Sequence, residues 1–128
     1  MGDFEKKELE PFYKNLQKRF PELQRLSVWA EWDWSNDGVE HSVVMSEVAR
    51  EMMRWAGNNE WQKVTELLKE IETGFVEGSD KLIAYLGTDF TVTITGCENQ
   101  QDREQIKKVM GKLTYNAYQI NLRGYREA

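Results

Sequence analysis

The chain has 128 residues, 40% of them hydrophobic and 12% aromatic, which is the composition of a folded globular protein rather than a disordered one. Its 17 basic and 22 acidic residues give a formal net charge of −5, which argues against general nucleic-acid binding because phosphate contacts need clustered lysine and arginine. The length predicts a single domain, residues 1–128, large enough to fold without disulfides or bound metal.

The chain contains one cysteine, Cys97, and one histidine, His41. These counts exclude an internal disulfide and a histidine-rich metal site, so we expect neither a metal nor a cofactor. The opening residues MGDFEKKELE lack the basic start and apolar stretch of a signal peptide, and no run approaches the roughly 18 apolar residues of a membrane span. We therefore expect a cytoplasmic protein without a membrane partner.

The first predicted helix is amphipathic. Its apolar residues recur at helical spacing at Leu9, Phe12, Tyr13, Leu16, Phe20 and Leu23. We expect Pro11 in the first turn, where a missing N–H costs little, and Pro21 to stop or bend the helix.

The stretch VWAEWDWSNDG, from Val28 to Gly38, follows this helix and holds three of the five tryptophans. Its apolar residues alternate with acids, so an extended segment would turn Trp32 and Trp34 to one face and two acids to the other. A lone strand leaves its backbone groups unpaired, so a strand here would need the only other alternating segment, DFTVTITG, as its partner.

Two longer helices are predicted in the middle of the chain. The first runs from Ser42, a plausible N-cap, to Ala56, with Gly57 as a left-handed stop and a broad stripe of methionine, valine and Trp55. That stripe is expected to be core, although a methionine-rich binding groove is the alternative. In the second helix, Asn59 and Gln62 form a capping-box pattern ahead of a buried face.

The C-terminal half predicts a short helix capped by Ser79 and closed by Gly87, and a last helix from about Asp102 to Leu122. Gly111 inside the last helix costs about 1 kcal/mol. Asp89–Gly96 fits a strand or a short helix, with helix slightly favoured by its helical neighbours. The predicted fold is all-α, with five to seven helices in stacked hairpins. One small two-stranded ribbon, giving an α+β fold, remains as the alternative.

Charge is distributed unevenly along the chain. Five acids and no lysine or arginine lie between Leu26 and Ala49, whereas Arg103–Arg126 holds six basic residues against Glu104 alone. Aromatic residues among acids, with no basic residue nearby in the sequence, are typical of a hot spot for a cationic protein. The predicted partner-binding residues are Trp29, Glu31, Trp32, Asp33, Trp34, Asp37 and Glu40. The competing interpretation is that Trp32 and Trp34 pack in the core while the acids keep the loop soluble.

Other chemistry has weaker signals. Glu31 with Asp33, or Glu40 with Glu47, could serve as paired carboxylates of a hydrolase, but their separation across a cleft is not visible in a sequence. Nothing around Cys97 resembles a nucleophile motif, so a buried or incidental thiol is expected there. His41, just ahead of a helix, is expected at the surface or as a cap. The chain has no nucleotide-binding, zinc-protease or calcium-loop motif.

Two blocks carry a resemblance to known proteins: HSVVMSEVAREMMRWAGNNEWQKVTELLKEIETGFVEGSDKLIAYLGTDF and MGKLTYNAYQINLRGYRE. Their pattern of helix, asparagine-containing turn, helix and Gly-Ser-Asp resembles small acidic helical bacterial proteins, some of them similar to immunity proteins of contact-dependent or polymorphic toxin systems. The resemblance implies an all-helical body and supports helix for Asp89–Gly96. It assigns no catalytic residue and does not include the tryptophan-rich stretch.

The sequence therefore predicts a non-catalytic protein-binding module, specifically an immunity protein that occludes the active site of a basic, nuclease-like bacterial toxin. The alternative is a small enzyme or ligand-binding protein with a tryptophan-lined acidic pocket. A third possibility is a dimerising protein in which the basic last helix meets the acidic segment of a second copy. We expect a monomer or a weak homodimer.

Overall fold

The computed structural model describes residues 2–26 and 41–127, with side chains described for residues 9–24, 26 and 41–121. The helical elements in chain order are α1 (Gly2–Arg19), η1 (Pro21–Arg25), α3 (His41–Gly57), α4 (Trp61–Glu77), α5 (Asp80–Tyr85), η2 (Leu86–Phe90), α6 (Thr91–Thr95), α7 (Gln100–Val109) and α8 (Lys112–Glu127). Within these two ranges there is no strand, so the all-α prediction is confirmed and the α+β alternative is not needed.

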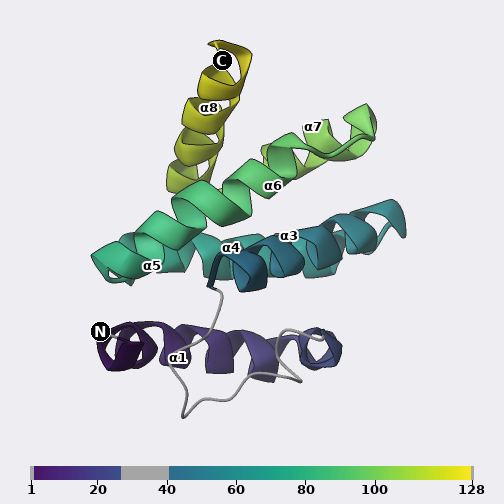
Figure 1. Cartoon of the computed structure of the whole chain (residues 1–128). Helices are drawn as coiled ribbons and strands as arrows, with labels where there is room; N and C mark the ends of the chain where they lie inside the picture. Colours follow the sequence, from purple (N-terminus) through teal and green to yellow (C-terminus); the bar gives the residue numbers. More distant parts are fainter. Residues whose placement is uncertain (1, 27–40, 128) are drawn as a thin grey trace.

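The helices form layers around the hairpin of α3 and α4 (Figure 1). Helix α1 lies on one side of this hairpin, and the continuous run α5–η2–α6 crosses it. Helix α8 packs on α6 and α4 and stands on the side of the hairpin away from α1, with its C-terminal end pointing outward. The two ends of the described chain are therefore on different sides of the molecule.

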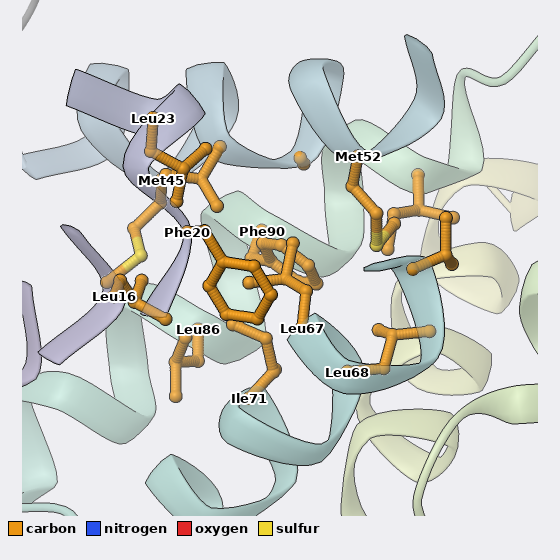
Figure 2. Packing of buried hydrophobic residues seen from close by; sticks show 14 of the residues in the cluster. Leu16, Phe20, Leu23, Met45, Met52, Leu67, Leu68, Ile71, Leu86 and Phe90 are labelled. Atoms are coloured by element: carbon orange, nitrogen blue, oxygen red, sulfur yellow. The ribbon is translucent and has the colours of Figure 1, made fainter. Parts of the chain in front are cut away.

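The core forms where α1, α3, α4 and η2 meet (Figure 2). Phe20, Leu67 and Phe90 belong to this core, and each of these residues is at least 95% buried. Met45 and Met52 are fully buried, so the methionine stripe is core rather than a binding groove. Burying each such side chain stabilises the fold by roughly 1.5 to 3 kcal/mol before conformational entropy is subtracted.

Helix α1 is longer than the sequence pattern predicts. It begins at Gly2, which places Pro11 inside the helix rather than in its first turn. It ends at Arg19, and Phe20 has φ −129° and ψ 78° because a residue before proline is pushed out of the helical region. Pro21 therefore stops α1 as predicted and opens the short helix η1.

The turn between α3 and α4 differs from the prediction. Asn58 N–H still donates to Arg54 O (3.1 Å), so the helical bonding passes Gly57, and the left-handed residue is Asn59 (φ 62°). Asparagine tolerates this conformation better than most residues. Helix α4 begins at Trp61, and the N-cap residue Glu60 makes no side-chain capping bond. The predicted stop at Gly57 and cap at Asn59 are wrong, because the left-handed residue lies two positions later and the N-cap residue one position later than predicted.

The helix that starts at Ser79 does not end at Gly87. Ser79 caps it as predicted, accepting a bond from Leu82 N–H (3.2 Å). The chain then continues through a π-helical turn, in which Thr91 N–H donates to Leu86 O five residues back, and runs on as α6. The slight preference for a helix rather than a strand at Asp89–Gly96 is therefore confirmed as far as Thr95.

The single helix predicted for Asp102–Leu122 is divided into α7 and α8. Asn99 caps α7, accepting from Asp102 N–H (3.0 Å), and Met110 is extended with ψ 142°. Helix α8 starts afresh because Glu72 of α4 caps its N-terminus. The Glu72 carboxylate accepts from Leu113 N–H (3.0 Å), Thr114 N–H (2.9 Å) and the Thr114 hydroxyl (2.8 Å).

Candidate protein-interaction surface

The predicted partner-binding residues Trp29, Glu31, Trp32, Asp33, Trp34, Asp37 and Glu40 all lie outside the described residues. Their grouping on one surface stays a prediction. Of the acids between Leu26 and Ala49, Glu47 is described, and it pairs with Arg50 one turn further along α3 (2.9 Å).

The chain on either side of this segment is held by the core. Leu26 packs partly buried against the core and its N–H donates to Leu23 O (3.1 Å). On the other side His41, the first residue of α3, is only 8% exposed. The segment is thus attached to fixed points at both ends.

The prediction that His41 lies at the surface or acts as a cap is wrong. Its Nδ1 lies 3.1 Å from the hydroxyl of the buried Tyr13 in α1, and the two rings are stacked with centroids 5.9 Å apart. Tyr85 of α5 lies on another side of the imidazole, with ring centroids 5.2 Å apart. Two tyrosines from helices distant in sequence bury the histidine, and no local pattern indicates such a neighbourhood.

The N-terminal part of α3 is also linked to η2 and α6 by polar contacts. The Ser42 hydroxyl donates to Asp89 Oδ2 (3.2 Å), and the Thr93 hydroxyl lies 3.2 Å from that of Ser46. A carboxylate beside the N-terminus of a helix is stabilised by the helix dipole. Ser42 therefore acts from inside the helix, as a link to Asp89, rather than as the predicted N-cap.

A hollow of about 410 Å³ lies between η1 and the α3–α4 turn. Its lining includes Glu22, Glu51, Arg54, Trp55, Glu60 and Lys63. Lys63 Nζ bridges the carboxylates of Glu22 (2.6 Å) and Glu60 (3.0 Å), and it lies 5.7 Å from the centre of the Trp55 ring. Hydrogen bonds to Glu22 and then Glu60 raise the pKa of Lys63, so this bridge stays charged.

The remaining acid in the hollow is Glu51, which is only 8% exposed and pairs with the exposed Arg54 (3.0 Å). The hollow therefore combines a tryptophan wall with three carboxylates and two cations. The ligand-binding alternative requires a pocket of this type, but none of the residues that line the hollow was among the predicted site residues. One sequence signal could have indicated this hollow: Glu51 is an acid on the otherwise apolar, buried face of α3.

A second hollow, of about 580 Å³ and shallow, lies on α8. Its lining includes Lys112, Leu113, Tyr115, Asn116 and Gln119, and Leu113 and Tyr115 are 40% and 41% exposed. Ile120, one turn further along, is 59% exposed. The N-terminal half of α8 thus buries one face on α4 and α6, and the middle of its exposed face is polar, with Asn116 and Gln119 between Leu113 and Tyr115.

Cys97 is buried, as predicted, in the connection between α6 and α7. Burial raises the pKa of its thiol, which favours the protonated, unreactive form. Among the described residues no three histidine, cysteine or acidic side chains come close enough together to hold a metal ion.

Comparison with known proteins adds no relative. No protein-family model, curated protein or solved structure matches the chain. Within the described residues, none of the helices has the length and apolar character needed to cross a membrane.

Proposed function

We propose that this protein is a non-catalytic protein-binding module that neutralises a basic bacterial toxin of nuclease type by covering its active site. The observation that carries the proposal is the charge gap between Leu26 and Ala49, where five acids and three tryptophans occur without one lysine or arginine. A nuclease binds phosphate with clustered cations, and an acidic surface is complementary to such a site.

The attachment of the segment supports this function. Leu26 and His41 are held by η1, α1 and α5, so the residues between them start and end at points fixed by the core. Fixed attachment lowers the entropy that a segment loses when it binds a partner. A cytoplasmic inhibitor of this kind needs no cofactor and undergoes no reaction itself.

The acids and the tryptophans would have separate roles. Glu31, Asp33, Asp37 and Glu40 would accelerate encounter with a cationic surface, an effect that weakens as salt screens the charges. Trp29, Trp32 and Trp34 would fill the partner's cleft and slow dissociation, since buried aromatic anchors carry most of the energy in such interfaces.

The proposal is tested with the candidate toxin domain encoded next to this chain in its own genome. The toxin's activity on nucleic acid and its affinity for the inhibitor are measured with the unmodified chain and with Trp29→Ala/Asp33→Lys. We expect the unmodified chain to inhibit and the double variant to bind at least about 100-fold more weakly, because aromatic and charged hot spots each contribute about 2 kcal/mol or more.

The matched control is Glu98→Lys, which reverses an exposed charge on the α6–α7 connection. It should inhibit as well as the unmodified chain. If the double variant inhibits undiminished, or if no toxin is encoded nearby and the chain protects no nucleic acid, the proposal is wrong.

The hollow beside Trp55 supports a second candidate, the binding of a small cationic ligand. Its three carboxylates exceed its two cations, so the side chains that line the hollow carry a net negative charge. Titration with free L-arginine followed by thermal unfolding tests this. A melting temperature that rises for the unmodified chain but not for Glu51→Gln would favour it, and an unchanged temperature would dismiss it.

A further inference from the structure

Glu51 is a buried acid with little polar support from the fold. Its side chain is 9% exposed, and apart from His41 the other buried residues of α3 are apolar. A carboxylate that has lost most of its water needs charged or hydrogen-bonding partners in the protein. Within residues 2–26 and 41–127, the Glu51 carboxylate has one such partner, the guanidinium of Arg54 (3.0 Å).

The guanidinium that pairs with Glu51 belongs to an exposed side chain. Arg54 lies one turn further along α3, and 69% of its side chain is exposed. Pairs with an exposed member contribute little to stability, because water competes for the charge and because ordering a long side chain costs entropy. Arg54 can therefore turn away from Glu51 without disturbing the core.

The space beside this pair is the hollow of about 410 Å³ between η1 and the α3–α4 turn. Its volume lies within the range of about 300 to 1,000 Å³ that is usual for small-molecule sites. Two of its carboxylates, Glu22 and Glu60, share the ammonium of Lys63 (2.6 and 3.0 Å). Glu51 is thus the carboxylate of the hollow whose counter-ion can leave.

We propose that the hollow binds an alkylguanidinium group, as found at the end of an arginine side chain, and that Arg54 occupies its place until such a ligand arrives. The contact between Arg54 and Glu51 shows that a planar guanidinium fits against this carboxylate. A ligand would form the same contact from within the hollow, and Arg54 would turn to solvent. The inference rests on the second candidate function, for which it names the ligand class and the regulation.

The first consequence is that Arg54 weakens binding although it lines the site. A site that is occupied by a group of the same chain is open for only a fraction of the time, and the apparent affinity falls by that fraction. Removing Arg54 should therefore strengthen binding of a guanidinium ligand. A hollow that used Arg54 to hold its ligand would lose binding instead.

The same helix contains a matched pair. Arg50 and Glu47 have the same spacing of three residues and nearly the same distance (2.9 Å). The Glu47 side chain, however, is 36% exposed, and it lies outside the lining of the hollow. Removing Arg50 makes the same change in charge, one turn away, without freeing a buried carboxylate.

Isothermal titration calorimetry with N-acetyl-L-arginine amide tests the proposal on the full chain. We expect Arg54→Ala to bind this probe at least about tenfold more tightly than the unmodified chain, because no internal group competes. Arg54→Met, which keeps an unbranched side chain without the charge, should give the same gain. Arg54→Ala/Glu51→Gln should lose the gain, and Arg50→Ala should stay within about twofold of the unmodified chain. Circular dichroism checks that every variant is folded.

Two further probes define the ligand. N-acetyl-L-lysine amide should bind Arg54→Ala at least about fivefold more weakly than the arginine amide, because an ammonium lacks the planar fork that matches a carboxylate. Free L-arginine adds an α-carboxylate and an α-ammonium. Weaker binding of free L-arginine than of the amide identifies an arginine residue within a polypeptide as the ligand, and tighter binding identifies the free amino acid.

The proposal is overturned if Arg54→Ala and Arg54→Met bind the arginine amide no more tightly than the unmodified chain, or if Arg50→Ala gains as much. Equal binding of the lysine amide overturns the ligand class. A rise in melting temperature of the unmodified chain with L-arginine, without a gain in Arg54→Ala, retains the second candidate function and rejects the role of Arg54. Binding by Arg54→Ala alone does the reverse, so the two fail separately.

Discussion

Replacing Glu72 with alanine should destabilise the fold more than any other single change at a partly exposed acid of α4. The side chain crosses from α4 to the N-terminus of α8 and accepts hydrogen bonds from Leu113 N–H, Thr114 N–H and the Thr114 hydroxyl. The first N–H groups of a helix have no partner inside it, so a carboxylate placed there has the effect of an N-cap.

The magnitude follows from three parts of this contact. Loss of an N-cap costs about 1 kcal/mol, and loss of a negative charge at a helix N-terminus costs about 0.3 to 1 kcal/mol. The Thr114 hydroxyl, on a residue with no exposed surface, loses its acceptor at a further cost of about 1 kcal/mol. The expected loss is about 2 to 3 kcal/mol, which lowers the melting temperature of a domain of this length by about 10 °C.

Thermal unfolding followed by circular dichroism measures the loss, and amide hydrogen exchange locates it. The amides of Leu113 and Thr114 should exchange faster in Glu72→Ala, while those in the middle of α4 change only with global stability. Glu72→Gln keeps one acceptor oxygen without the charge and should show about half the effect. The control Glu77→Ala removes an exposed acid from the same helix and should change stability by no more than about 0.5 kcal/mol. Equal melting temperatures for Glu72→Ala and Glu77→Ala would refute the capping argument.

Three further predictions concern the same end of the molecule. Burial would raise the pKa of Glu72, but the hydrogen bonds from Leu113 and Thr114 outweigh burial and hold the pKa below its ordinary value of 4.5. The stabilisation by the ionised Glu72 carboxylate is therefore full above that pH and is lost as the pH falls through the lowered pKa. In acid titrations of the melting temperature, the stability difference between the unmodified chain and Glu72→Gln should be constant near neutral pH and shrink below about pH 4.5. A Cβ at Gly111 would overlap the Glu72 side chain, so Gly111→Ala alone should lower the stability by about 1 to 2 kcal/mol. In the Glu72→Ala background, the same substitution should leave the stability unchanged. Additive losses in this double-mutant cycle would contradict the overlap. Asn121→Ala removes an amide that donates to Gly87 O (2.6 Å) in the π-helical turn and should cost about 1 to 2 kcal/mol by denaturant unfolding, whereas Asn116→Ala, at an exposed position on the same helix, should be neutral.

The features that the sequence predicts correctly are those set by residues close together in the chain. The apolar stripes of α1, α3 and α4 are buried because a period of 3.6 residues puts them on one face, whatever that face packs against. Pro21 ends α1 and Ser79 caps α5 for equally local reasons, through the conformation before proline and a bond three residues ahead.

The features that the sequence does not predict depend on partners far away in the chain. His41 looks like a residue at a helix start, but Tyr13 and Tyr85 bury it, and both lie more than 25 positions away. The acidic hollow has the same origin, since Glu22 reaches Lys63 from η1. The tryptophan segment could be recognised by composition alone, and its role stays a prediction because its residues lie outside the described ranges.

Gly111 has opposite effects in the predicted helix and in the folded chain. Taken as part of one long helix, it is a flexible position that costs about 1 kcal/mol. In the folded chain it directly precedes α8. Tyr115 N–H donates to Gly111 O (2.9 Å), and the missing side chain leaves room for the carboxylate of Glu72 in α4. The glycine therefore stabilises the junction that it was expected to weaken.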